Sequence, residues 1–155
     1  MSESSAVNHI LAVLGEAMDG PSHQLSYFLD KGPDAGLRNT LAGLSAEEAS
    51  KPIGGTSIAA HVHHIIFSAR AFGAFITGDH RKHDWNDSWV VSEVDGAAWD
   101  ALRTDVETTH GGLCEIVRKH AVTDDASMGG SVAAVAHVAY HVGAIRQKLS
   151  TLRSA

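Results

Sequence analysis

Two histidines in the stretch HVAYHVGAI, His137 and His141, have a spacing that would suit a metal ion held on one side of a helix. Residues four apart lie on the same helix face, so two imidazole rings can share an ion there. The zinc-protease motif HExxH has the same spacing, but Val138 stands where its catalytic glutamate would be. The pair is therefore either half of a metal site with different chemistry or two histidines that happen to lie one turn apart.

A second group of histidines lies in the stretch SIAAHVHHI. In a helix, His61 and His64 would fall on the same flank of the apolar stripe, whereas His63 would point elsewhere. His137 and His141 would likewise lie on one edge of the stripe of their own helix. Metal sites in helical bundles are built from side chains on facing helices. Two helices that each offer a pair of imidazoles therefore predict a site for a divalent transition metal.

The elements that must position these histidines are predicted to be helices, because alternating strand patterns are absent. Helices are expected over four long and two short segments: 4–18, 57–77, 96–120 and 131–152, and 25–29 and 36–44. Ser45 and Glu48 have the spacing of a capping box. The stretch DHRKHDWNDSWVVSEV at 79–94 is predicted to be a loop, and TDDASMGGS at 123–131 a turn. The pattern favours an all-α, four-helix-bundle domain over residues 1–155, with an extra N-terminal helical segment.

Composition limits the classes of function. A chain of 155 residues suits one domain, and a net charge of −6 argues against a nucleic-acid partner. No apolar run is long enough to cross a bilayer, and the start MSESSAVNHILAVLG lacks the basic region of a signal peptide. The single cysteine, Cys114, excludes an intrachain disulfide. We therefore expect a cytoplasmic protein that binds neither nucleic acid nor membrane.

Both histidine motifs resemble those of the DinB/YfiT-like superfamily of metal-binding four-helix bundles. In that family a segment of the form S-[VI]-x-x-x-[VL]-x-H-[LI] opens the second helix of the bundle, and SIAAHVHHI matches it with His64 at the ligand position. The motif HxxxHxGQI on the last helix supplies the other two ligands, and HVAYHVGAI matches it at His137 and His141. The resemblance spans about 36–152. It implies a three-histidine site, which accounts for the missing glutamate.

Two departures from the family pattern bear on the site. Ala144 replaces the usual glutamine after HxG, which would alter the surroundings of the ligands or the contacts to substrate. The helical wheel also places His61 nearer the buried stripe than His64, so His61 would be a fourth ligand, a partner that supports a ligand, or a residue lining the pore. Trp85 and Trp89 would either wall the mouth of the site or cap the end of the bundle.

The resemblance implies a metal-dependent enzyme that acts on a small molecule. Characterised members include S-transferases and isomerases that use the thiols bacillithiol or mycothiol, whose pKa a divalent ion (Zn, Ni or Fe) would lower. The same ion could activate water for hydrolysis. Such thiols carry carboxylates, so basic side chains are expected at the mouth, with Arg70, Arg146 and Lys148 as candidates. The alternative is a non-catalytic bundle that binds a metal or a small ligand. The family commonly dimerises, which implies a homodimer.

Overall fold

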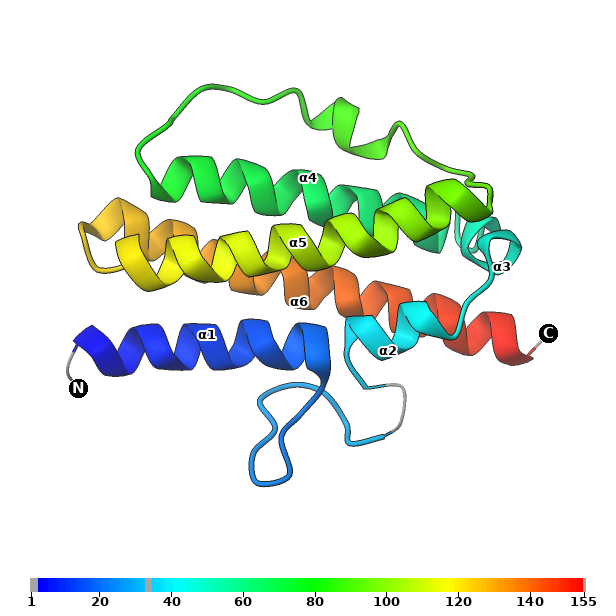
Figure 1. Ribbon diagram of the computed structural model, residues 1–155, viewed down its shortest axis with the longest axis horizontal. Helices are drawn as coiled ribbons and strands as arrows, with labels where there is room; N and C mark the ends of the chain where they lie inside the picture. The colour runs from blue at the N-terminus through cyan, green and yellow to red at the C-terminus, as the bar shows by residue number, and fades with distance from the viewer. Residues whose placement is uncertain (1–2, 33–34, 155) are drawn as a thin grey trace.

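The computed structural model describes residues 3–32 and 35–154, and it is all-helical over them (Figure 1). Within these ranges there is no β-strand, and a single isolated bridge joins Ile53 and Thr56. The predicted all-α class is therefore confirmed. The helices are α1 (Glu3–Asp19), α2 (Leu37–Ala42), α3 (Ala46–Ser50), α4 (Ile58–Ile76), the 3₁₀ helix η1 (Trp85–Trp89), α5 (Gly96–His120) and α6 (Asp125–Ser154).

Four long helices lie lengthwise beside one another around a common apolar core (Figure 1). α4 packs against α5 and α6, and α1 packs against the same two helices from the other side. The stripes predicted on the two histidine-bearing helices are buried here: Ile58, Val62, Ile65, Ala69 and Ile76 of α4, and Val138, Val142, Ile145 and Leu149 of α6. Burial of each of these side chains other than Ala69 stabilises the fold by about 1.5–3 kcal/mol. The core therefore fixes how the histidine faces of α4 and α6 meet.

The ends of α4 follow from its sequence. Ser57 is the N-cap, and its hydroxyl accepts a hydrogen bond from the backbone N–H of Ala60 at 3.1 Å. Gly78 follows the last turn with φ of 89°, in the left-handed region that favours glycine. The helix predicted over 57–77 is confirmed. Ser45 and Glu48 likewise form the predicted capping box at the start of α3.

The turn predicted over 123–131 is confirmed only at Thr123 and Asp124 and is wrong beyond them, because α6 already begins at Asp125. The carboxylate of Asp124 accepts a hydrogen bond from the backbone N–H of Ser127 at 2.7 Å and so starts the helix. Gly129 and Gly130 are helical, and Gly130 serves packing. A Cβ on Gly130 would lie 2.8 Å from Cδ1 of Phe75, so only glycine lets α6 approach α4 this closely.

The length and composition of α6 alone would allow it to cross a membrane. The core helix of a soluble protein passes the same test, and much of the apolar side of α6 is buried against other helices. The sequence contains no comparable stretch among the other described helices. This finding therefore carries no argument for a membrane.

The helix predicted at 25–29 is also wrong, because this segment folds as a loop around Glu16. The buried carboxylate of Glu16 accepts hydrogen bonds from the backbone N–H groups of Tyr27, Phe28 and Leu29, at 2.6, 2.9 and 2.7 Å. Burial alone would raise the pKa of Glu16, but the hydrogen bonds from this loop outweigh it and lower the pKa. An ionised side chain of α1 therefore replaces the helical hydrogen bonds of this segment.

Replacing Glu16 with glutamine is expected to lower the free energy of unfolding by about 2–3 kcal/mol, because hydrogen bonds to a charged, buried acceptor are lost. The lowered pKa means that this stabilisation is present at neutral pH and is lost as the pH falls below the ordinary range of a glutamate. Urea unfolding at pH 7 would measure the change. Glu93→Gln, at an exposed position, is the matched control. Equal stabilities of the two variants would contradict the role of the Glu16 carboxylate.

Candidate metal centre

The structure brings together the three histidines that match the family motif. His64 projects from α4, and His137 and His141 project from α6. One ring nitrogen of each lies within 4.8 Å of the other two. Nε2 of His64 lies 2.9 Å from Nε2 of His137. Two nitrogen atoms bonded to one ion at ~2.0–2.1 Å are about 3.0–3.4 Å apart, so a small outward shift would accommodate a metal.

Ser88 fixes which nitrogen of His64 is free. The buried hydroxyl of Ser88 donates its proton to the backbone carbonyl of Trp85, over 2.6 Å from Oγ to O. The hydroxyl oxygen must therefore accept from Nδ1 of His64, which lies 2.7 Å away. That arrangement leaves a lone pair on Nε2 of His64, the atom that faces His137. Metal-binding histidines are commonly oriented in this way through their second ring nitrogen.

His61 contacts His141 rather than joining the group of three. Its Nδ1 lies 3.0 Å from Nδ1 of His141, and its Nε2 lies 3.1 Å from Oγ1 of Thr56. A proton on Nδ1 of His141 leaves Nε2 of that ring free for a metal, with His61 as the acceptor. Of the roles considered for His61, this contact favours a partner that supports a ligand.

Burial keeps these imidazoles neutral. It lowers the pKa of His64 and of His61 to about 4 and that of His141 to about 3, with the charges of neighbouring histidines or, for His61, of Lys148 as a smaller cause. Burial also lowers the pKa of His137. Neutral rings have the free lone pairs that metal binding requires. The donor set therefore fits a divalent transition metal at neutral pH.

The tryptophans of the 79–94 loop cover the histidines rather than capping the end of the helices. Trp89 stacks on His64, with ring centroids 4.1 Å apart and an interplanar angle of 20°. Trp85 lies 6.1 Å from both His64 and His137, centroid to centroid. Nδ1 of His63 donates to the carbonyl of Ser88 over 2.9 Å and so ties the loop to α4. These rings exclude bulk water from the imidazoles.

The basic side chains expected at the mouth of the site are engaged elsewhere. Arg70 pairs with Asp105 on the surface. Lys148, which is buried, donates to the backbone carbonyls of Ile53 and Thr56. Arg146 lines a separate cavity. Lys148 therefore holds the turn that carries Thr56, the hydrogen-bond partner of His61, and it does not offer a free charge to a ligand.

Replacing Ser88 with alanine is expected to weaken zinc binding about 10- to 100-fold, because the hydroxyl that orients His64 is lost. Competition with a chromophoric zinc chelator would measure the affinity. Ser92→Ala in the same loop is the control, since only the backbone carbonyl of Ser92 makes a described contact, to Ser57. An unchanged affinity in Ser88→Ala would show that His64 does not depend on this hydrogen bond.

Ser88 is the residue of this site that the sequence analysis missed. The motif that contains it, DWNDSW, drew attention to its tryptophans, and a serine between them gives no signal of its own. What marks Ser88 is its full burial against a histidine of another element.

Comparisons of this chain with protein-family models, with curated proteins and with solved structures found no match.

Proposed function

We propose that this chain is a DinB/YfiT-like four-helix bundle in which His64, His137 and His141 hold one divalent transition metal, with zinc, nickel and iron as candidates. The observation that carries the proposal is the meeting of three neutral imidazoles from two helices, one of them with its second nitrogen occupied by Ser88. Such a set is typical of catalytic metal sites, where three protein ligands leave a position open.

The proposed activity is that of a metal-dependent enzyme acting on a small molecule, by thiol-dependent S-transfer or by hydrolysis. A bound ion would act as a Lewis acid and would lower the pKa of a bound thiol or water molecule toward neutrality. The residues of the chain hold that site in place. Ser88 orients His64, His61 supports His141, and the rings of Trp85 and Trp89 keep out bulk water.

One observation favours a second candidate, a non-catalytic bundle that binds a metal or a small ligand. Trp89 lies stacked on His64 and edge-on to His61 at 5.3 Å, so the histidines are covered on this side. A covered site suits a structural or sensing role. An enzyme would need the 79–94 loop to move before a substrate could reach the histidines.

Metal analysis followed by a thiol titration tests the proposal. Untagged protein purified without a chelator is expected to contain about one equivalent of a transition metal by mass spectrometry. The Co²⁺-substituted protein would then be titrated with N-acetylcysteine. A change in the d–d spectrum supports the thiol-dependent enzyme, whereas no change supports the hydrolase or the non-catalytic bundle. A protein that is metal-free and takes up neither Zn²⁺ nor Ni²⁺ contradicts the three-histidine site.

We also propose that the protein is a cytoplasmic homodimer. The outward face of α6 exposes apolar side chains, among them Val132 and Tyr140, with exposed fractions of 53% and 71%. These residues lie eight apart and so share one side of the helix. Burial of this face against a second copy would remove its apolar surface from water.

A further inference from the structure

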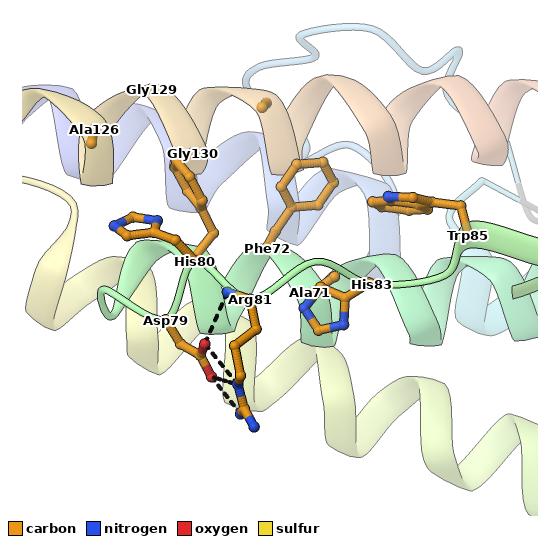
Figure 2. Close-up of a pocket in the computed structure, with 12 residues that line it drawn as sticks. Ala71, Phe72, Asp79, His80, Arg81, His83, Trp85, Ala126, Gly129 and Gly130 are labelled. Atoms are coloured by element: carbon orange, nitrogen blue, oxygen red, sulfur yellow. Dashed lines mark hydrogen bonds and ion pairs between the residues drawn. The ribbon is translucent and has the colours of Figure 1, made fainter. Parts of the chain in front are cut away.

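A cavity of about 500 Å³ lies next to the metal centre, between the start of the 79–94 loop and the first turns of α6 (Figure 2). Its volume is in the range of small-molecule sites. The aromatic side chains of Phe72, Phe75 and Trp85 line it, and Figure 2 shows Phe72 and Trp85 on the side that faces α6. No residue of the cavity has a part in the metal site as proposed above, apart from Trp85.

Small residues of α6 create this space. Ala126 and Gly129 line the cavity opposite the aromatic rings, whereas Gly130 lies against the ring of Phe75. A Cβ built on Gly129 would meet no atom within 4 Å, so the absence of a side chain there is not required by packing. The cavity is therefore lined by aromatic rings on one side and by nearly bare helix at Ala126 and Gly129 on the other, a lining that suits an aromatic group stacked on the rings.

The charged residues at the rim of the cavity neutralise one another. Nε of Arg81 donates to both carboxylate oxygens of Asp79 at 2.9 Å, and the pair is closed within the loop (Figure 2). The other polar groups of the lining are the imidazoles of His80 and His83. An anionic or cationic ligand would find no unpaired opposite charge among these described side chains. The cavity therefore favours an uncharged group.

The cavity adjoins the metal centre through two of its lining side chains, although none of the three grouped histidines lines it. The ring of Phe72 lies 5.5 Å from that of His137, and the ring of Trp85 lies 6.1 Å from it. A group held against Phe72 and Trp85 is thus one side chain away from a proposed metal ligand. Movement of the 79–94 loop, which carries Trp85, would let the rest of the same molecule reach the histidines.

We infer that this cavity binds an uncharged, planar aromatic group of the molecule on which the metal centre acts, an inference that rests on the proposed function. Calorimetric titration of the zinc-supplemented protein with 2-naphthol tests it. The probe is expected to bind about tenfold more tightly than its saturated counterpart decahydro-2-naphthol and than the anion 2-naphthoate.

Glycine-to-leucine variants test the location. Gly129→Leu should occupy part of the cavity, because a Cβ there meets nothing within 4 Å, and weaken 2-naphthol binding about tenfold or more, while leucine in place of glycine favours the helix. Gly111→Leu on α5, where a Cβ also meets nothing within 4 Å, is the matched control and should bind 2-naphthol as the wild type does. Far-UV circular dichroism would confirm that both variants fold.

The outcomes separate this inference from the proposed function. Equal affinity for 2-naphthol and decahydro-2-naphthol, or undiminished binding by Gly129→Leu, overturns the inference. Zinc bound at one equivalent without any binding of 2-naphthol overturns it while leaving the metal centre intact. Zinc content, measured by mass spectrometry on the same samples, reports on the metal centre independently. Binding of 2-naphthol to a protein that takes up no metal would overturn the assignment of the cavity to a metal-dependent substrate.

Discussion

Replacing His141 with alanine is expected to lower the affinity for zinc on the order of 1,000-fold, more than the 10- to 100-fold cost of losing a residue that only supports a ligand. Two ligands would remain, and His141 is buried where water replaces an imidazole poorly. Competition with a chromophoric chelator would measure the dissociation constant. His64→Ala should behave in the same way, because its ring belongs to the same group of three.

Two other histidines provide the comparison. His23→Ala, in an exposed loop, is the control and should leave the affinity unchanged. His61→Ala should weaken zinc binding by about 10- to 100-fold, because His61 supports His141 through the contact between their Nδ1 atoms. A loss in His61→Ala as large as that in His141→Ala would identify His61 as a fourth ligand. Retention of zinc by His141→Ala would refute the site.

Acidification of the metal-free protein is expected to lower its free energy of unfolding by at least about 3 kcal/mol between pH 7 and pH 4, since one pKa unit corresponds to ~1.36 kcal/mol. Burial lowers the pKa of His61 and His64 to about 4 and that of His141 to about 3. In the unfolded chain these groups return to the ordinary range near 6.5. The unfolded state therefore binds more protons across this window, and stability falls as the pH falls through it.

Urea unfolding at several pH values in the presence of a chelator would measure this dependence. The imidazoles interact with one another, so their contributions do not add. His141→Asn, which has one fewer buried imidazole, should lose less stability than the wild type over the same range. A urea midpoint that stays constant from pH 7 to pH 4.5 would contradict the burial of neutral histidines.

The side of each helix on which the histidines lie could be predicted from helical spacing. The periodic apolar residues of α4 and α6 determine which side of each helix faces the core, and the histidines keep a constant angle to that side. Ser57 caps the start of α4 with its hydroxyl, and Gly78 follows its end with a positive φ. Serine and glycine at such places are recognisable in the sequence. Local signals therefore sufficed for α4 and for the flanks that carry the histidines, whereas the choice of His64 over His61 came from the resemblance to the family motif.

The features that could not be predicted depend on contacts between distant segments. Gly129 and Gly130 have the composition of a turn but lie within α6, which packs against Phe75 at Gly130. The loop over 25–29 has apolar residues at helical spacing, but three of its N–H groups bind the carboxylate of Glu16 instead. Ser88 acquires its role only where the loop crosses α4. Such pairings leave no periodic pattern in the sequence.

The double attachment of Ser88 to α4 has a kinetic consequence. Its carbonyl accepts from His63 and its hydroxyl accepts from His64, so the 79–94 loop cannot rise from α4 without removing the hydrogen bond that orients a proposed ligand. Opening of the loop and release of the orienting hydrogen bond on His64 would then occur together. We expect the exchange of bound zinc for isotopically labelled zinc to proceed at the rate at which the loop opens. Ser88→Ala should exchange zinc faster than its equilibrium affinity alone would suggest, and a molecule that wedges the loop open should act as a releasing agent for the ion.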